Sequence, residues 1–267
     1  IMSEKNCKGK TPEDYGFHMP EKKNSFKIDL NEKSSAKKII GVVSGKGGVG
    51  KSFVTSMLAC EMARRGYRVG VLDGDITGPS QTKAFGIHEK AMGDGKYIYP
   101  YITKNGIQVI STNMILDSDE TPVIWRGPMV ANILKQFYTD VVWDNVDYMF
   151  VDMPPGTSDV PLTAFQSFPL DGIVVVTSPQ ELVSMVVEKA INMAQSMDIK
   201  VLGLIENMSY VECPNCNEKI EIFGKSHINE VSEKYGLPVL AKIPMRQTVA
   251  ASAEDGTMEV LEIPEIK

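Results

Sequence analysis

Short apolar runs recur along the chain from residue 37 onward, and within each run the apolar residues are consecutive instead of alternating with polar ones. Runs of this kind are typical of strands that are buried on both faces of a parallel sheet. They therefore predict the strands of one central sheet. The six runs are Ile39–Val43, Val69–Leu72, Tyr148–Val151, Ile173–Val176, Val201–Ile205 and Val239–Ile243.

Apolar residues recur at helical spacing between several of these runs. The two longest stretches are Phe53–Arg65 and Leu182–Met197, and residues 130–138 and 226–235 are shorter candidates. Residues 86–106 read as a loop or a small hairpin insertion. Strands that alternate with helices imply right-handed crossovers. We therefore predict an α/β fold of three layers, in which a mostly parallel central sheet carries helices on both faces and binds ligands beyond the carboxyl ends of its strands.

The pattern divides the chain into a leader and one folded domain. Residues 1–36 are rich in Lys, Glu, Asn, Ser and Pro and show no period, so we expect a flexible N-terminal leader. Residues 37–267 are long enough for one large α/β domain with its own core.

Charge and hydropathy narrow the classes of partner. The formal net charge is −6 at pH 7, which argues against broad, non-specific binding to nucleic acid or to an anionic membrane. No apolar run approaches the roughly 18–20 residues that span a bilayer, and the N-terminal region lacks the apolar core of a signal peptide. We therefore expect a cytoplasmic protein that has neither nucleic-acid nor membrane partners.

A glycine-rich loop follows the first apolar run and precedes the first helical stretch. Its sequence, Ser44-Gly-Lys-Gly-Gly-Val-Gly-Lys-Ser52, contains the pattern G-x-x-x-x-G-K-[ST], so we name residues 45–52 the phosphate loop. Glycines let backbone N–H groups surround phosphate oxygens, and the following helix directs its N-terminal dipole at the same anion. Lys51 is placed to neutralise β- and γ-phosphate charge, and the Ser52 hydroxyl is placed to ligate Mg²⁺. The predicted nucleotide contacts are Gly45, Lys46, Gly47, Gly48, Val49, Gly50, Lys51, Ser52 and Phe53.

Carboxylates follow two of the predicted strands and are expected beside this loop. The second run leads into Asp73-Gly-Asp75, and the third run is followed by Asp152. An acid in the position of Asp152 holds Mg²⁺ directly or through water. Asp75 either orients the attacking water or binds Mg²⁺ through water, and Asp73 supports the metal shell. Spacing alone does not divide these roles between them.

Two of the four cysteines form a closely spaced pair, Cys213-Pro-Asn-Cys216. Two thiolates at this spacing grip one metal centre, but most such centres need four ligands. Taken alone, the pair equally fits a redox pair, half of a zinc site or half of an iron–sulfur cluster site. If two such pairs meet at a two-fold axis, they supply four thiolates. Cys60 is expected to be a small buried apolar residue, and Cys7 has no partner nearby in the sequence.

The loop K-G-G-V-G-K-S, residues 46–52, is similar to the deviant Walker A loop of the MinD/ParA/nitrogenase-iron-protein class. In that class the early lysine reaches across a dimer interface to the nucleotide of the partner. The resemblance therefore implies a nucleotide-sandwich homodimer. Its catalytic residues would be Lys46, Lys51 and Asp75.

Together the motifs resemble the Mrp/ApbC-type P-loop ATPases, which are cytosolic iron–sulfur cluster carriers, over about residues 37–264. The resemblance implies slow ATP hydrolysis with Mg²⁺ and a [4Fe–4S] cluster bridged between two chains by Cys213 and Cys216, for which Zn²⁺ is a rival occupant. Apo iron–sulfur proteins and a cluster-assembly scaffold would be its partners. Asn207 would contact adenine, although from the residues alone it equally fits a loop-capping role, and the segment after Pro244 would pack nearby. The matching runs are residues 45–52, 73–80, 152–159, 206–209, 213–216 and 243–244.

Other functions share part of this pattern. A MinD/ParA-like positioning switch has the same nucleotide motifs, but the chain shows no basic amphipathic C-terminal anchor. A reductase of the nitrogenase-iron-protein kind has two widely separated cysteines. A zinc-binding P-loop ATPase would hold Zn²⁺ at the same C-x-x-C pairs, because a site of four cysteines suits zinc equally well. The chain departs from the carrier family at Asn217 and Gly74, where Gly and Ala respectively are commoner, and it lacks the four-cysteine N-terminal motif of eukaryotic relatives.

Overall fold

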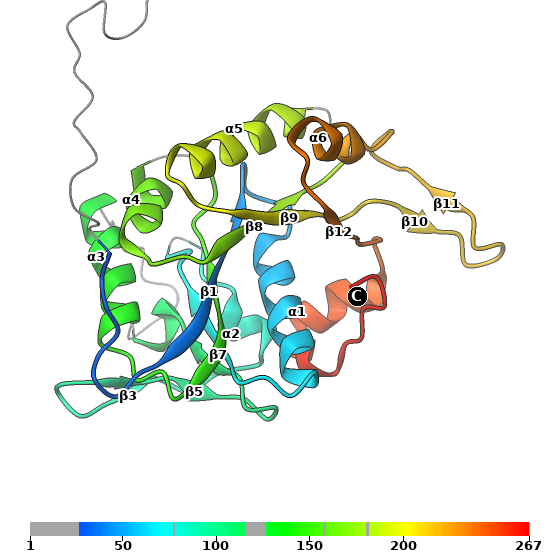
Figure 1. Cartoon of the computed structure of the whole chain (residues 1–267). Helices are drawn as coiled ribbons and strands as arrows, with labels where there is room; N and C mark the ends of the chain where they lie inside the picture. Colours follow the sequence, from blue (N-terminus) through cyan, green and yellow to red (C-terminus); the bar gives the residue numbers. More distant parts are fainter. Residues whose placement is uncertain (1–26, 77, 116–126, 157–158, 180–181, 267) are drawn as a thin grey trace, which may run out of the picture.

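The computed structural model describes residues 27–76, 78–115, 127–156, 159–179 and 182–266, and an eight-stranded sheet forms their centre (Figure 1). Its strands are β1 (Ala36–Ser44), β2 (Val69–Asp73), β5 (Tyr101–Ile102), β6 (Gln108–Ile110), β7 (Val146–Asp152), β8 (Gly172–Thr177), β9 (Val201–Glu206) and β12 (Val239–Lys242). Their order across the sheet is β12-β9-β8-β1-β7-β2-β6-β5, and only the pair β5–β6 is antiparallel. The predicted mostly parallel sheet is confirmed.

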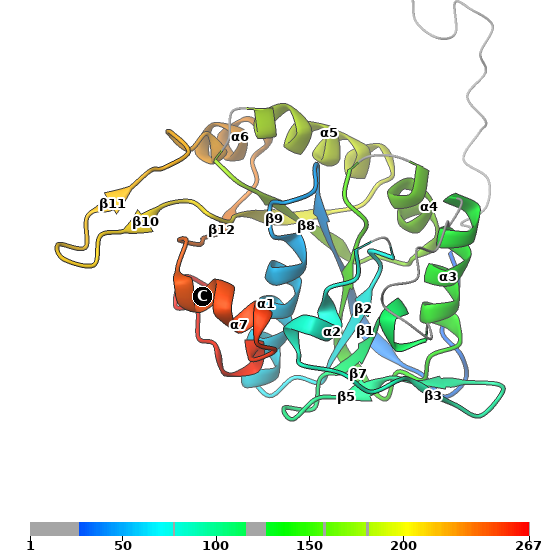
Figure 2. The same cartoon turned by 180° about the vertical axis from the view of Figure 1, so that it is seen from behind.

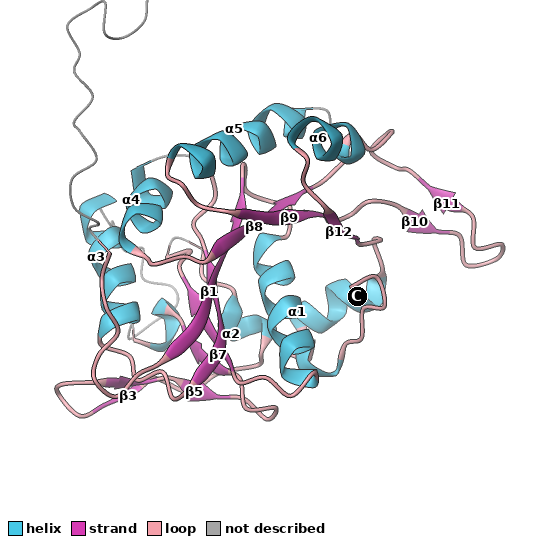
Figure 3. Cartoon of the chain, viewed as in Figure 1, coloured by secondary structure: helices cyan, strands magenta, loops and turns pink. Residues whose placement is uncertain are grey.

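Helices cover both faces of this sheet and give the three predicted layers (Figure 3). They are α1 (Lys51–Arg64), α2 (Gln81–Ala84), α3 (Gly127–Thr139), α4 (Asp159–Ser167), α5 (Leu182–Ser196), α6 (Ile228–Tyr235) and α7 (Gln247–Glu254), with short 3₁₀ helices η2 (Thr112–Met114) and η3 (Met258–Val260). Figures 1 and 2, which view the molecule from opposite sides, show α3, α4, α5 and α6 along one face and α1, α2 and α7 along the other.

The six predicted strands and the four predicted helical stretches are present. Residues 86–106 contain the predicted hairpin, in which β3 (Met92–Gly93) pairs antiparallel with β4 (Ile98–Tyr99), and their last part continues into β5. The pattern did not predict β5, β6, α2, α4 or α7.

Strand register brings the chemically interesting residues to one edge of the sheet. Central β1 lies between β7 and β8, and its interior is apolar, with Val42 fully buried. Asp73 pairs with Asp152, and Thr177 pairs with Glu206, so the carboxyl ends of β2, β7, β8 and β9 are aligned. Polar groups therefore collect at this edge, where ligands of parallel sheets bind.

The segment before β1 is tied to the helical layer. Ile28 donates its N–H to the Ser167 carbonyl at 3.0 Å, and the Asn31 amide donates to the carbonyls of Thr139 and Val141 at 2.8 Å each. Residues 1–26 of the expected leader lie outside the described residues. In the described part of the chain, no helix has the length and apolar character needed to cross a membrane.

Candidate nucleotide and metal site

The phosphate loop connects β1 to α1 and uses left-handed backbone at two of its glycines. Gly48 has φ +82° and Gly50 has φ +80°, a region that side chains disfavour. Gly50 is also packed closely, because a Cβ atom there would lie 2.2 Å from Nδ2 of Asn207. Glycine at residue 50 is therefore required by both backbone conformation and space.

Lys51, at the start of α1, and Asp152, at the end of β7, form a buried ion pair beside this loop. The Lys51 Nζ atom contacts Asp152 Oδ1, and the two side chains are only 6% and 0% exposed. Thr55 Oγ1, one turn along α1, lies 3.3 Å from the same oxygen. Charges buried this deeply require partners, and each supplies the other's. The structure thus brings together the two residues that the sequence assigned to phosphate and to metal.

Asp73 is fully buried at the end of β2 and organises the segment that follows. Burial, and next the repulsion from Asp152, raise the pKa of Asp73 above its usual range. Its hydrogen bonds fix the backbone around Asp75. The donors are the N–H groups of Asp75 (3.2 Å), Ser80 (3.1 Å) and Gln81 (3.1 Å) and the hydroxyl of Ser111 (3.0 Å).

Several other predicted nucleotide residues are partly accessible to solvent. Lys46 is half-buried within the loop, and its carbonyl accepts the Ser44 hydroxyl at 2.9 Å. Asp75, Ser52 and Phe53 are also half-buried. Residues 77, 157 and 158 of the two acidic motifs lie outside the described residues.

Sequence reasoning missed Gln81, which lies at the start of α2. Its side chain is 0% exposed and contacts Asp152, Ser52 and Ser56. The only signal in the sequence is its position directly after the run of residues 73–80, because a polar residue there lies close to the same sheet edge.

A largely apolar pocket of about 400 Å³ opens beside the phosphate loop. The Asn207 side chain lies at its edge, 7% exposed, and donates to the Val49 carbonyl at 3.0 Å. Asn207 therefore caps the loop and also lines a pocket within the size range of small-molecule sites. The lining residues are Phe53, Asn207, Met208, Pro244, Met245, Arg246, Gln247, Val249, Ala250 and Ala253.

The cysteine pair lies on a separate hairpin, formed by β10 (Val211–Glu212) and β11 (Lys219–Ile220). We name residues 210–225 the cysteine arm, and Figures 1 and 2 show it reaching away from the body. Cys213 is half-buried and Cys216 is exposed. Backbone N–H groups of Asn215 and Cys216 hydrogen-bond to the Cys213 sulfur and lower the pKa of its thiol.

Cys60, in contrast, belongs to the core. Its side chain is buried in α1, and burial raises the pKa of its thiol to about 12. The expectation that Cys60 is a small buried apolar residue agrees with this environment. Among the residues that the structure describes, no group of three or more His, Cys, Asp or Glu side chains is placed to hold a metal ion.

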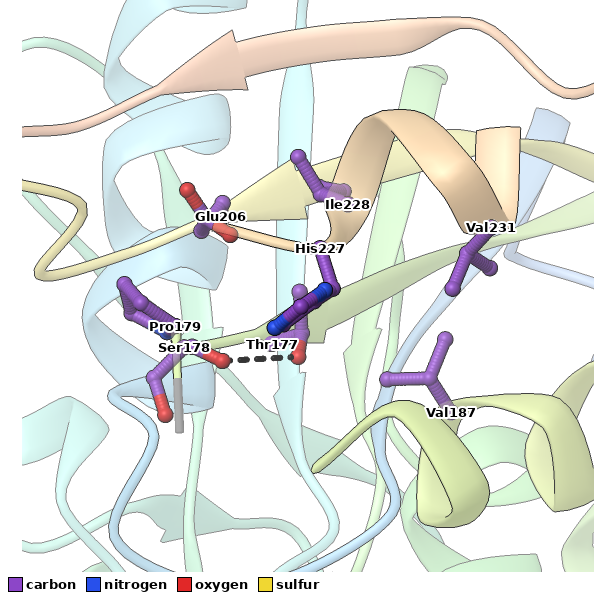
Figure 4. A pocket seen from close by; sticks show the side chains of 8 residues that line it. All are labelled: Thr177, Ser178, Pro179, Val187, Glu206, His227, Ile228 and Val231. Carbon is purple, nitrogen blue, oxygen red and sulfur yellow. Dashed lines mark hydrogen bonds between the residues drawn. The ribbon is translucent and has the colours of Figure 1, made fainter. Parts of the chain in front are cut away.

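Glu206 lies at the end of β9, beside a small cavity (Figure 4). It is almost fully buried and accepts hydrogen bonds from the hydroxyls of Ser209 at 2.5 Å and Ser226 at 2.7 Å. Ser209 precedes the arm and Ser226 follows it, so one carboxylate joins both ends. A small cavity beside Glu206 is lined by Thr177, Ser178, Pro179, Val187, Glu206, His227, Ile228 and Val231.

The glycine loop, the buried lysine–aspartate pair and their place at the carboxyl edge of a parallel sheet define a P-loop NTPase. Comparison with known proteins narrows this class. Residues 35–267 match the ParA family model described as NUBPL iron-transfer P-loop NTPase, so the chain belongs to that family.

Relatives with known names agree with this assignment. An iron–sulfur cluster carrier protein of Clostridium perfringens (strain 13 / Type A) is 47% identical over 231 residues, which cover 84% of this chain and 81% of the relative. The protein of the same name from Methanocaldococcus jannaschii is 43% identical over 230 residues, which cover 85% and 79%.

Solved structures support the fold, and one of them contains a nucleotide. A nucleotide-binding protein from Archaeoglobus fulgidus, solved in complex with ADP, superposes with a TM-score of 0.77 at 39% identity and covers 86% of this chain and 90% of its own. The cell division ATPase MinD of Pyrococcus furiosus superposes with a TM-score of 0.60 at 21% identity, over 86% and 92% of the two chains. The second similarity shows the fold alone.

Proposed function

We propose that this chain hydrolyses ATP at the phosphate loop and carries a [4Fe–4S] cluster, held between two copies by the cysteine arms, to apo iron–sulfur proteins. The observation that carries the proposal is the pair of half-buried Cys213 and exposed Cys216, which lies on an arm that projects from the same body that holds a nucleotide loop. The names of the relatives, and the ADP in one related structure, favour the same combination.

The nucleotide site supplies positioning and charge. Lys51 exchanges Asp152 for the β- and γ-phosphates, and the N–H groups of the loop bind their oxygens. The purine base enters the pocket between Phe53 and Asn207. Asp75 orients the attacking water. The donor set of Ser52 hydroxyl and Asp152 carboxylate fits Mg²⁺, which prefers oxygen ligands and would neutralise phosphate charge there.

Lys46 acts across the dimer in this proposal. Phosphoryl transfer is promoted by positive charge that reaches the transferred group, and an arginine finger in this role contributes ~10³–10⁵ in rate. A lysine near the tip of the loop is suited to reach the nucleotide of a partner copy, whereas Lys51 serves the nucleotide of its own chain.

The cysteine arm provides the cluster site and part of the interface. Each arm offers two thiolates, and a cluster of this type takes four, so two arms complete the set. Beside the thiols the arm exposes Ile220, Ile222 and Phe223, which are 48%, 58% and 38% exposed. Grouped apolar side chains of this size are typical of contact surfaces, and burying them would exclude water from the cluster. The recipients and a scaffold that loads the cluster approach this end of the dimer.

Anaerobic reconstitution tests the proposal. The full chain, treated with iron and sulfide, should hold about two iron atoms per chain and absorb near 400 nm, because one [4Fe–4S] cluster serves two chains. Cys213→Ser should lose the cluster and still bind ATP, while the matched control Cys60→Ser should keep both. About four iron atoms per chain, or a cluster retained by Cys213→Ser, would contradict bridging. Zinc in place of iron after anaerobic loading would favour the zinc-binding ATPase instead.

A further inference from the structure

Gln81 joins three parts of the nucleotide site through one buried side chain. Its Nε2 atom donates to Asp152 Oδ2 at 2.8 Å and to the Ser52 carbonyl at 3.0 Å. Its Oε1 atom accepts the Ser56 hydroxyl at 2.7 Å. Its backbone N–H donates to Asp73 Oδ2 at 3.1 Å. Both amide hydrogens and the amide oxygen are therefore used, as a fully buried amide requires.

The two oxygens of Asp152 have different partners. Oδ1 is held by Lys51 and Thr55, whereas Oδ2 is held by Gln81. When Lys51 turns to phosphate, the strongest partner of Oδ1 leaves. The Gln81 amide stays bound to Oδ2, because its two N–H groups donate to the Ser52 carbonyl and to Asp152 itself, and neither acceptor binds phosphate. The hydrogen bond from Gln81 then sets the orientation of the Asp152 carboxylate.

We propose that Gln81 is a positioning residue for magnesium: it fixes Asp152 through Oδ2 and so aims Oδ1 at the metal that Ser52 and Asp152 would hold. The inference rests on the proposed function. Gln81 also binds the carbonyl of Ser52, so it fixes the distance between the two metal-binding residues. Partners of this kind orient metal ligands, and their loss reduces metal affinity by about 10- to 100-fold.

The test substitutes Gln81→Met in the full chain, which keeps the volume and removes every side-chain hydrogen bond of Gln81. The Ser56 hydroxyl lies 3.0 Å from the Ser52 carbonyl and can remain bonded to it, so the variant is expected to fold. The Mg²⁺ concentration for half-maximal binding of a fluorescent ADP analogue should rise by about tenfold or more. ADP affinity measured in excess EDTA should change by less than about twofold, because no phosphate contact is lost.

A matched control separates positioning from stability. Gln108 on β6 is also buried and makes two amide hydrogen bonds of 2.9 Å, both to the backbone of Asp144. Gln108→Met should lower the melting temperature to a similar extent and leave the Mg²⁺ requirement at the wild-type value. If Gln81→Met does not fold, Ser56→Ala frees the amide oxygen of Gln81 and should raise the Mg²⁺ requirement by about twofold to threefold.

The outcomes are distinct. A wild-type Mg²⁺ requirement in a folded Gln81→Met protein would overturn the inference and leave the proposed function standing. A requirement raised equally by Gln108→Met would overturn it too, since the effect would then come from general loosening. If wild-type protein binds ADP identically with and without Mg²⁺, the proposed magnesium site fails and the positioning role of Gln81 fails with it.

Discussion

Gly50 and Asn207 are packed so closely that a side chain at residue 50 would meet the Asn207 amide. Gly50 lies directly before α1 and has φ +80°, and the Asn207 amide occupies the space that a Cβ atom of residue 50 would need. Gly48 has nearly the same φ, +82°, but a Cβ atom there would meet nothing within 4 Å. Substituting Gly48 therefore tests backbone strain alone, whereas substituting Gly50 tests backbone strain together with steric crowding.

We expect Gly48→Ala to reduce the free energy of unfolding by about 1 kcal/mol, the strain of a left-handed alanine. Gly50→Ala should reduce it by about 2 kcal/mol more, because the methyl group also displaces Asn207. Urea denaturation of both variants measures the difference. Equal losses in the two variants would mean that Asn207 moves aside without strain.

The two kinds of cysteine should differ sharply in reactivity. The thiolate is the reactive form, and the thiol of Cys213 has a lowered pKa, whereas the pKa of Cys60 is raised to about 12 by burial. In metal-free protein near neutral pH, iodoacetamide should therefore modify Cys213 well before Cys60, as peptide mass spectrometry would show. Lowering the pH should slow Cys213 at a midpoint below the ~8.5 of a free cysteine. Comparable labelling of Cys60 under native conditions would contradict its burial.

Two residues that depart from the carrier family have structural reasons at this scale. Asn217 has φ +59°, and among side-chain-bearing residues asparagine tolerates this conformation best, so it fits where glycine is commoner. Gly74 lies so close to β7 that a Cβ atom would be 2.7 Å from the Asp152 carbonyl oxygen.

The sequence predicted the charged and thiol residues of the site, because their chemistry identifies them. It did not predict Gln81, since only the folded geometry shows what a neutral amide contacts.

At the scale of elements, the length and the burial of an element decided whether the sequence revealed it. Five of the six predicted strands are mostly buried and have continuous apolar runs, and β12 was found by its apolar run although it is a short edge strand with one buried residue. Strand β6 has only three residues and α2 only four, too few for any period. Helix α7 has no buried residue, so its sequence lacks the pattern of a helix packed in the core. Helix α4 contains Pro161, which usually disfavours a helix but is tolerated in its first turn.

The cysteine arm is an element whose stability depends on its base. Removing the hydroxyl in Ser226→Ala leaves Glu206 with one fewer donor, and a hydrogen bond to a charged group contributes about 1.5–3 kcal/mol. We expect faster amide hydrogen exchange along residues 210–225, with little change in the central sheet. Ser196→Ala is the control, because its exposed hydroxyl bonds only the Asn192 carbonyl one helical turn away. Unchanged exchange in the arm would show that Glu206 does not hold it.

At the scale of the whole molecule, the nucleotide site and the cysteine arm meet at adjacent residues. Asn207 caps the phosphate loop, and its neighbour Glu206 closes the base of the arm. Glu206 is the last residue of β9, and Asn207 is the next residue along the chain. A change in the loop on nucleotide binding therefore has a short covalent route to the arm that would hold the cluster.

If the proposed dimer forms, mixing two inactive lysine variants should restore part of the ATP hydrolysis. Lys51→Ala should lose ATP hydrolysis, because the phosphates of the nucleotide bound to that chain lack their cation. Lys46→Ala should also lose hydrolysis but keep its nucleotide affinity within about tenfold, because this lysine acts mainly on the charge that develops in the transition state. If Lys46 serves the partner, a dimer of one chain of each kind has one intact site. That site has Lys51 from the Lys46→Ala chain and Lys46 from the other.

Equal mixing gives half mixed dimers with one of two sites intact, so about one quarter of wild-type activity should return if dimers exchange freely. The measurement is phosphate release by each variant alone and by the mixture at the same total concentration. Doubling the share of one variant should lower the recovered activity, since mixed dimers become fewer. Two inactive proteins that stay inactive after mixing, although cross-linking shows that they pair, would place Lys46 at the nucleotide of its own chain.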